Sequence, residues 1–265
     1  MQKCFNGLTT VNVEITSRCN KKCWMCGRRK IERDFPELVD WGDMSFDLAK
    51  SIAKQLPPGI VVQLHNNGEP TLYPRLGEVI SLFEKQIKHF DTNGKLIVEK
   101  ADEIIGNLDT MTISVIEDDP EADEQYERVI QFLDLRGKRK PNLIYRCLGN
   151  VDLERYKKLP GIIATRILHS PMGSFKYVKN PTVPEIGICL DLLGHLVIDR
   201  YGKVSPCVRF DPKRIGVIGD ANITPLIDIW NGKERKKWLD AHIKGERKKI
   251  PLCSYCEFWG VPTGY

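Results

Sequence analysis

The spacing of apolar residues changes repeatedly along the first two-thirds of the chain. Short apolar runs of strand length alternate with stretches whose apolar residues recur every three or four positions, as on one face of a helix. The expected strands are residues 8–15, 60–65, a short segment before Asn93, 110–116, 142–148 and 162–168. The expected helices are residues 46–56, 76–85, 98–108, 121–135 and 153–159. Six such repeats predict an α/β fold with parallel strands and crossover helices.

The pattern changes after Pro171-Met-Gly-Ser174. Two short apolar runs, 196–198 and 204–207, flank a turn-forming segment and predict a β-hairpin. Two helical stretches follow, one ending near Trp230 and one over residues 233–244, where Trp238, Ala241 and His242 are expected to face inward. We therefore predict two domains, residues 1–170 and residues 171–265.

Composition and charge narrow the class of protein. The 265 residues are 42% hydrophobic and 28% charged, as in ordinary globular proteins. No apolar run reaches the roughly 18 residues of a membrane span, and the first residues lack a secretory signal, so we expect a cytoplasmic protein. Nine cysteines then favour metal binding over disulfides. Basic clusters at 138–140, 235–237 and 247–249 fit either solvated surfaces or a nucleic-acid or phosphate-bearing partner.

Three cysteines near the start of the chain form the most informative local motif. Cys19, Cys23 and Cys26 have C-x3-C-x2-C spacing, and the absence of histidine between them disfavours a mixed cysteine–histidine zinc site. A [4Fe–4S] cube held by protein alone uses four cysteines. Three cysteines leave one iron with an open coordination position, which a catalytic metal requires and a structural metal does not.

At this motif and at three further segments the chain resembles the radical S-adenosylmethionine (SAM) enzymes. Residues 66–70, Asn-Asn-Gly-Glu-Pro, are similar to the family's Gly-Glu-Pro segment after the second barrel strand. Residues 92–94, Thr-Asn-Gly, are similar to its segment after the third strand, and the run 111–115 resembles the fourth strand with its serine. The resemblance implies a partial (β/α)6 barrel, with ligands at the C-terminal ends of the strands.

The resemblance also implies cofactors. The three cysteines would hold a [4Fe–4S] cluster whose open iron binds SAM. A reductant such as flavodoxin or ferredoxin would drive SAM cleavage to a 5′-deoxyadenosyl radical, which abstracts hydrogen from the substrate. The residues expected to bind SAM are Gly68, Glu69, Pro70, Asn93, Ser114, Arg146 and Met25.

Specific contacts are expected for several of these residues. Gly68 would let the backbone approach the methionine moiety, and Glu69 would accept a hydrogen bond from its ammonium group. Asn93 and Ser114 would contact ribose or carboxylate, and Arg146 would pair with the SAM carboxylate. Structural alternatives stay open: Ser114 bonded only to backbone, residues 69–70 as a simple turn, and His65 as a packed side chain.

A second cysteine set lies near the C-terminus. Cys189, Cys207, Cys253 and Cys256 fill all four positions of a metal site, so this site is closed to substrate. The spacing resembles the short form of the SPASM domain, called Twitch, which consists of a β-hairpin and helix around an auxiliary [4Fe–4S] cluster. Structural zinc is the alternative, because four thiolates suit both metals. Of the two remaining cysteines, Cys147 is expected to be a small buried residue and Cys4 a spare thiol.

Three hypotheses for the function, and one further alternative, remain open. The compact C-terminal layout most closely resembles that of the 2-deoxy-scyllo-inosamine dehydrogenase-like members, which implies oxidation of a small polar substrate with the auxiliary cluster accepting an electron. A redox-neutral rearrangement or modification of a nucleotide or nucleic-acid base is the second hypothesis, motivated by the basic clusters. Peptide modification is a further alternative, although relatives of that kind usually carry additional modules. A non-enzymatic metal scaffold is the third hypothesis.

Overall fold

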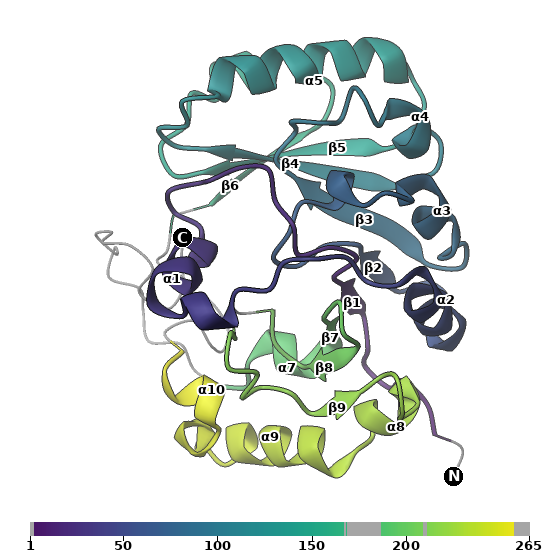
Figure 1. The fold of residues 1–265 in the computed structure, drawn as a ribbon, viewed down its shortest axis with the longest axis vertical. Helices are drawn as coiled ribbons and strands as arrows, with labels where there is room; N and C mark the ends of the chain where they lie inside the picture. Colours follow the sequence, from purple (N-terminus) through teal and green to yellow (C-terminus); the bar gives the residue numbers. More distant parts are fainter. Residues whose placement is uncertain (1–2, 167, 169–186, 209–210, 257–265) are drawn as a thin grey trace.

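The computed structural model of the chain describes residues 3–166, 168, 187–208 and 211–256 (Figure 1). The change of pattern predicted at residues 171–174 lies outside the described residues, so the domain boundary stays a prediction. No helix in these ranges is both long and apolar enough to cross a membrane.

The described strands form one sheet in the order β6-β5-β4-β3-β2-β1-β7-β8-β9. Neighbouring strands from β6 to β7 are parallel, and the last two pairings, β7–β8 and β8–β9, are antiparallel. The strands are β1 (Thr10–Val13), β2 (Val61–Gln63), β3 (Ile87–Thr92), β4 (Thr110–Ile116), β5 (Asn142–Leu148), β6 (Ile162–Arg166), β7 (His195–Ile198), β8 (Lys203–Ser205) and β9 (Gly219–Asp220). The predicted α/β fold with six parallel β/α repeats is confirmed.

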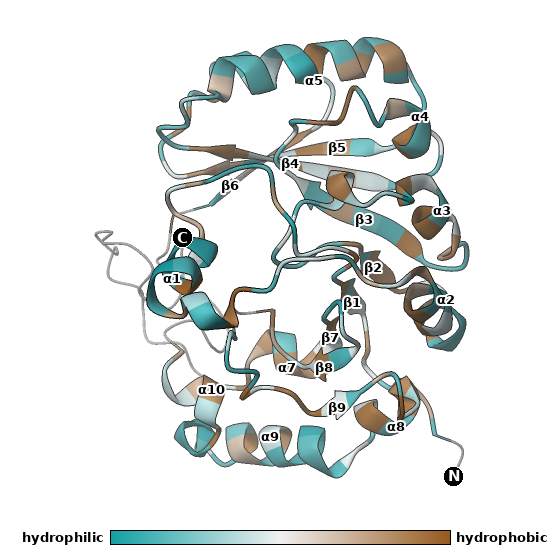
Figure 2. Ribbon diagram, in the orientation of Figure 1, coloured by the Kyte–Doolittle hydropathy of each residue, from teal (hydrophilic) through white to brown (hydrophobic). Residues whose placement is uncertain are grey.

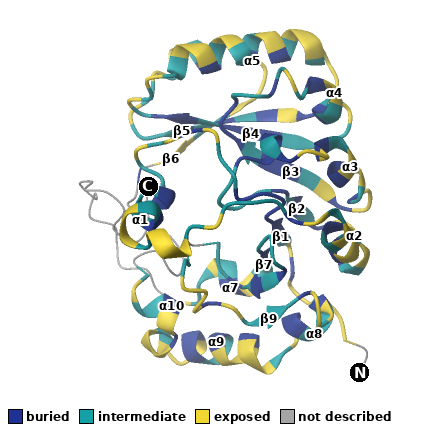
Figure 3. Cartoon of the chain, viewed as in Figure 1, coloured by how far each residue is buried: buried dark blue, intermediate teal, exposed yellow. Residues whose placement is uncertain are grey.

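Crossover helices cover the outer side of this curved sheet (Figure 1). The helices between β1 and β6 are α1 (Gly27–Asp34), α2 (Phe46–Gln55), α3 (Leu76–Ser81), α4 (Ala101–Ile104), α5 (Ala122–Arg136) and α6 (Glu154–Lys157). Short 3-10 turns, η1 (Pro36–Leu38) and η2 (Pro70–Leu72), interrupt the loops after β1 and β2. Outward-facing strand residues and the inner faces of α2–α5 make one continuous core, so burial of apolar surface holds the helices to the sheet (Figures 2 and 3).

Alternating burial along the strands shows that the sheet has two different faces. In β5, Leu143, Tyr145 and Cys147 are buried toward the helices, whereas Ile144 and Arg146 lie on the opposite, partly accessible face. Successive side chains of a strand point to opposite faces, so polar residues of several strands gather on the inner face of the curved sheet. Cys147 is a buried core residue as predicted.

The C-terminal hairpin continues the barrel sheet instead of forming a separate one. β7 pairs in parallel with β1, with Val13 opposite Ile198, and β8 turns back antiparallel through a turn that ends at Gly202 (φ +84°). The remaining elements are α7 (Leu190–Gly194), α8 (Leu226–Trp230), α9 (Lys233–Ile243), the 3-10 turn η4 (Arg247–Lys249) and α10 (Pro251–Ser254). Trp238, Ala241 and His242 are buried as predicted.

Among the helices that precede β6, three differ clearly from the sequence prediction. The helix expected over residues 98–108 is only α4, because Ile105 adopts an extended backbone and Gly106 a positive φ of +85°. The helix expected over residues 76–85 ends early as α3, with turns after Ser81. α1 was not predicted, because its eight residues, GRRKIERD, include a single large apolar side chain, Ile31.

Removal of the predicted N-cap of α2 gives the first test of the fold. Ser45 Oγ accepts a hydrogen bond from the Leu48 N–H at 3.2 Å. We expect Ser45→Ala to cost about 1 kcal/mol, because that N–H loses its partner. In a protein of this size this corresponds to a fall of about 2–4 °C in melting temperature, measured by circular dichroism. Ser51→Ala, on the exposed side of the same helix, is the control and should not lower the melting temperature.

Candidate functional site

The loop that carries the first cysteine set joins β1 to α1. Cys26 is the residue before α1, and its N–H donates to the Cys23 carbonyl at 3.2 Å, which closes a tight turn. Burial, followed by the neighbouring thiol of Cys26, raises the pKa of Cys23 to about 12, and Cys19 contributes in the same direction. The three thiols therefore gather at one place, where a bound metal would favour their thiolate forms. This donor set fits an iron–sulfur cluster with three protein ligands.

Gly68 packs against the chain that leads into the cysteine loop. A Cβ at this position would lie 2.1 Å from the Thr16 carbonyl oxygen and 2.8 Å from the Ser17 Cα. The next residue, Glu69, donates its N–H to the Arg18 carbonyl at 2.7 Å. The close approach that requires glycine in the structure is to residues 16–18, and the predicted approach to the methionine moiety of SAM stays a prediction. The reason for glycine is thus packing of one strand end against another.

The Glu69 carboxylate joins the ends of β2 and β3. Its Oε1 accepts hydrogen bonds from the Thr71 hydroxyl and the Thr92 hydroxyl, both at 2.7 Å, and its Oε2 accepts from the Asn93 N–H at 2.7 Å. Burial raises the pKa of Glu69 above its usual value, and these hydrogen bonds offset only part of the rise. Pro70 begins η2 and is buried. The contact of Glu69 with the SAM ammonium stays a prediction. Oε2 is the oxygen that would make it, because it accepts fewer hydrogen bonds within the protein than Oε1.

Asn93 lies directly beside the first cysteine set. Its Nδ2 donates to Asn20 Oδ1 at 2.8 Å and lies 3.9 Å from Cys19 Sγ. Gln125 of α5 holds the ends of β3 and β4 together, because its Nε2 donates to the carbonyls of Asn93 (2.7 Å) and Ser114 (3.0 Å). The structure therefore brings both predicted residues to the strand ends near the loop. Gln125 was missed, although its place on the inner face of a predicted helix could have singled it out.

A buried ion pair fixes the cysteine loop from the other side. Lys21, which lies between two of the cysteines, pairs with Asp119 in the loop after β4, and its Nζ is 3.4 Å from Glu121 Oε2. The side chains of Lys21 and Asp119 are only 5% and 4% exposed. Trp24 Nε1 donates to the Glu117 carbonyl of the same loop at 3.0 Å, and Met25 is half-buried beside it. Sequence reasoning missed this pairing, because nothing in a lysine between cysteines shows that it is buried.

Arg146 faces the interior of the barrel but is paired with Asp91 of β3 there. Both terminal guanidinium nitrogens of Arg146, Nη1 and Nη2, bond the Asp91 carboxylate, with Nη2 at 3.2 Å from Oδ1. Although burial alone would raise it, His65, His89 and Arg146 hold the pKa of Asp91 well below its usual range. Arg146 was predicted to pair with the SAM carboxylate, but in the structure its partner is this internal acid.

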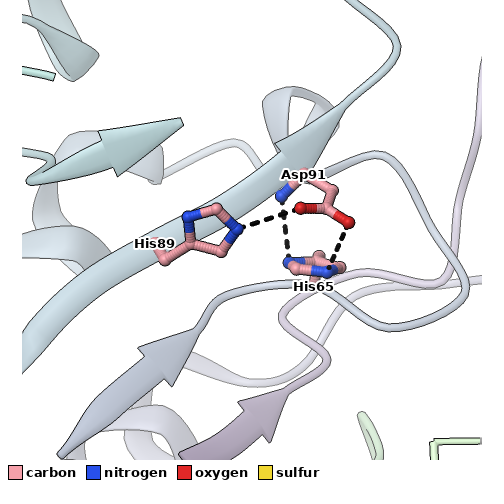
Figure 4. A group of neighbouring side chains, drawn as sticks. All are labelled: His65, His89 and Asp91. Atoms are coloured by element: carbon pink, nitrogen blue, oxygen red, sulfur yellow. Dashed lines mark hydrogen bonds and ion pairs between the residues drawn. The ribbon is translucent and has the colours of Figure 1, made fainter. Parts of the chain in front are cut away.

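Two histidines complete the group around Asp91 (Figure 4). His89 Nε2 lies 2.9 Å from Oδ1, and His65 Nε2 lies 3.3 Å from Oδ2. The Asp91 N–H donates to His65 Nδ1 at 3.0 Å, so His65 carries its proton on Nε2. Two histidines and an aspartate can bind a metal ion, but here the Arg146 cation already occupies the carboxylate. The group is therefore a neutralised hydrogen-bond network, and His65 is a packed side chain.

The second cysteine set converges in the C-terminal region. Cys189 precedes α7, Cys207 follows β8, and Cys253 lies in α10. These three pack against a separate small core of Leu192, Trp238, Ala241, Ile250 and Leu252. Burial, followed by the neighbouring thiols of Cys256 and Cys189, raises the pKa of Cys253 to about 12. The four thiols thus form one donor set suited to a metal with soft-ligand preference.

His242 of α9 contacts two members of this set. Its Nδ1 accepts a hydrogen bond from the Cys189 N–H at 3.4 Å, so its proton lies on Nε2. That Nε2 is 3.5 Å from Cys253 Sγ and donates to it. His242 therefore places a hydrogen-bond donor on the sulfur of Cys253, one of the four cysteines of this set.

A cavity of about 780 Å³ lies between the cysteine loop region and the C-terminal hairpin. Barrel residues line one side and hairpin residues the other, and the lining includes Cys207 of the second set. Most of the lining side chains are polar or charged, among them Glu14, Asn67, Asp199 and Arg200. The cavity therefore suits a small polar molecule next to the C-terminal cysteine set.

The basic clusters have partners within the chain. Lys140 pairs with Asp109 at 2.7 Å, and Arg247 donates to the Cys256 carbonyl at 3.2 Å. Arg235 is buried over the Trp230 ring and donates to carbonyls of α7. Each cluster thus has a member used for internal contacts, and the predicted nucleic-acid partner finds no support in them.

Two regions of the chain match models of known protein families. The family model described as "Radical SAM superfamily" matches residues 13–151, and the SPASM model, described as "Iron-sulfur cluster-binding domain", matches residues 189–257. The second match decides between the two metals left open for the C-terminal cysteines, in favour of iron–sulfur.

Individual relatives agree with these matches. The chain is 24% identical over 262 residues to the S-adenosyl-L-methionine-dependent 2-deoxy-scyllo-inosamine dehydrogenase of Niallia circulans, covering 96% of this chain and 94% of that protein. It is 26% identical over 171 residues to the tungsten-containing aldehyde ferredoxin oxidoreductase cofactor-modifying protein of Pyrococcus furiosus, covering 56% and 45%.

Solved structures show the same fold. The crystal structure of BtrN in complex with AdoMet and 2-DOIA matches with a TM-score of 0.64 and 19% identity, covering 97% of this chain and 95% of that one. Streptococcus suis SuiB bound to S-adenosylmethionine matches with a TM-score of 0.62 and 14% identity, covering 95% and 72%.

Loss of the Lys21 ion pair tests how the first cysteine loop is held. In Lys21→Met the Asp119 carboxylate would stay buried without this cation, which costs about 3–5 kcal/mol when one partner of a buried pair is removed. We expect a lower melting temperature and less iron per chain after anaerobic reconstitution. Lys22→Met, an exposed neighbour in the same loop, is the control. Equal iron content in the two variants would show that the pair does not support the loop.

Loss of the His242 hydrogen bond tests its effect on the C-terminal cluster. Hydrogen bonds to cluster sulfurs influence the reduction potential, and a donor stabilises the added negative charge of the reduced state. We expect His242→Leu to lower the potential of this cluster and leave the N-terminal one unchanged, in a redox titration followed by electron paramagnetic resonance. His242→Gln retains an N–H donor and should recover part of the shift. Identical potentials in all three proteins would contradict the assignment.

Proposed function

The chain belongs to the radical SAM superfamily and carries a SPASM iron–sulfur domain, and from this premise we propose that it dehydrogenates a small polar substrate. The observation that supports this proposal is the position of Cys207, a ligand of the second cluster, in the wall of the polar cavity. An electron acceptor beside the substrate is what an oxidation needs after hydrogen abstraction. The relative with dehydrogenase activity aligns over nearly the whole chain.

Two sets of cysteines would hold the cofactors. Cys19, Cys23 and Cys26 would bind the cluster that also binds SAM, and Cys189, Cys207, Cys253 and Cys256 would bind the auxiliary [4Fe–4S] cluster. When bound, the first cluster with SAM supplies hydrogen abstraction from an unactivated C–H, and the second supplies a one-electron acceptor. We expect flavodoxin or ferredoxin as the external reductant and a cytoplasmic location, where thiols stay reduced.

The chain's own residues would orient and enclose the reactants. Asn93, Glu69 and the Gly68-Pro70 turn lie at the strand ends beside the first cysteine set, where they can orient SAM. Ser114 has no hydroxyl hydrogen bond within the described residues, which leaves its Oγ available for SAM. Met25 would lie against the cofactor from the cysteine loop.

Cysteine variants separate the two sites. Replacing Cys19, Cys23 and Cys26 by alanine should abolish release of 5′-deoxyadenosine under reducing conditions, because the iron that binds SAM is lost. Cys253→Ala should retain this release but lose the oxidised product. Wild-type protein should hold about eight irons per chain and each variant about four, since each cubane contributes four. Release of 5′-deoxyadenosine by the triple variant would exclude the assignment of the first site.

A further inference from the structure

Glu14 is a buried carboxylate in the wall of the polar cavity. It follows β1 directly and is 4% exposed. Its Oε1 accepts a hydrogen bond from the Asn67 N–H at 3.1 Å, and its Oε2 accepts a long one from the Arg200 N–H at 3.4 Å. Both donors are backbone groups, and Glu14 forms no ion pair within the described residues. Its charge is therefore not balanced by a neighbouring cation.

The cations closest to Glu14 are engaged elsewhere. The Arg28 guanidinium bonds the carbonyls of Ser17 and Asn67 and stacks on the Trp41 ring, 3.8 Å from its centroid. The Arg200 guanidinium pairs with Asp40 at 2.7 Å and bonds the hydroxyl of the next residue. Neither is placed to neutralise Glu14, and a buried carboxylate without a cation is costly in the ionised state.

The nearby carboxylate of Asp199 adds to the cost of ionising Glu14. Burial, with a contribution from Asp199 on the hairpin, raises the pKa of Glu14 to about 7, against the opposing effects of its backbone hydrogen bonds and of Arg28. The charged groups that face Glu14 are thus Asp199, Arg28 and the backbone dipole at Arg200. With its pKa raised toward neutrality, both the neutral and the ionised forms of the side chain are accessible, and a bound cation would favour the ionised form.

A divalent metal ion does not suit this position. Metals such as calcium or magnesium take several oxygen ligands, often from more than one carboxylate. The second carboxylate nearby, Asp199, already accepts hydrogen bonds from the N–H groups of Tyr201 and Lys203, and its Oδ2 is 3.3 Å from Arg214. A single carboxylate without an ion-pair partner among the described residues matches a monovalent cation that also donates hydrogen bonds.

We propose that Glu14 binds the protonated amine of the substrate, and that the substrate class is a small hydroxylated amine. This inference rests on the proposed function, because it takes the cavity beside Cys207 as the substrate site. The ammonium group pairs with Glu14, and the hydroxyl groups meet polar side chains that line the same cavity, among them Asn66. Glu14 is in this view a specificity-determining residue.

Matched ligands that differ only in the amine test the proposal. Binding to the reconstituted holoprotein is measured by anaerobic calorimetry for trans-2-aminocyclohexanol against trans-1,2-cyclohexanediol, and for glucamine against sorbitol. At about pH 8 the amine of at least one pair should bind about tenfold or more tightly than its hydroxyl partner, which corresponds to about 1.4 kcal/mol. The preference should fall as the pH drops to about 5.5, because Glu14 becomes protonated while the amine stays charged.

Variants assign the preference to Glu14. Glu14→Gln keeps the size of the side chain and an acceptor for the Asn67 N–H, and it should remove both the preference and its pH dependence. Glu37→Gln, which removes an exposed acid from the wall of the same cavity, should keep both. Iron content and melting temperature verify that each variant is folded, and the pH series on wild-type protein requires no variant.

Several outcomes would overturn the proposal. Equal affinity for amine and hydroxyl ligands at about pH 8, binding of neither, or a preference that survives Glu14→Gln would each do so. Slower turnover in Glu14→Gln with unchanged amine affinity would instead make Glu14 a proton acceptor. Release of 5′-deoxyadenosine is recorded in parallel, because its absence would overturn the proposed function while the binding data still decide the role of Glu14.

Discussion

The pairing of β1 with two parallel neighbours is the constraint on which the rest of the structure depends. β1 lies between β2 and β7, and the ladder extends past the strand through the Glu14 N–H, which donates to the Ile198 carbonyl at 2.9 Å. The loop that carries the first cysteine set and the hairpin that precedes Cys207 therefore start from adjacent points of one sheet edge. Residues that flank the cysteine loop and residues of the hairpin, with Cys207, consequently line one cavity although they are far apart in the chain.

The cysteine loop has little regular structure and is held by neighbouring strand ends. Gly68 after β2 packs on residues 16–18, Asn93 after β3 bonds Asn20, and Asp119 after β4 pairs with Lys21. Each successive repeat of the barrel thus contributes one contact to the loop. A ligand-binding segment held in this way can present its thiols in a defined arrangement without a helix or strand of its own.

Two buried carboxylates inside the barrel show two ways of meeting the cost of burying a charge. Asp91 is neutralised within the protein by Arg146 and bonded by two histidines. Glu14 has only backbone donors, and its pKa is raised to about 7. The first arrangement is complete by itself and stabilises the barrel interior, whereas the second is completed only by a partner from outside the chain. The cavity wall at Glu14 is therefore the part of the barrel interior where we propose that a ligand binds.

The sequence by itself determined the six β/α repeats, the bounds of β4 and β5, the hairpin and both cysteine sets, because these follow from local periodicity and spacing. It also placed Asn93 and Ser114 at strand ends, since parallel strands align their C-terminal ends. Only the tertiary structure decided that Gly68 meets backbone, that Arg146 pairs with Asp91, and that Lys21 is buried on Asp119. These partners lie 50 to 98 positions away along the chain. Their choice depends on how side chains of different strands pack, which no local pattern of residues encodes.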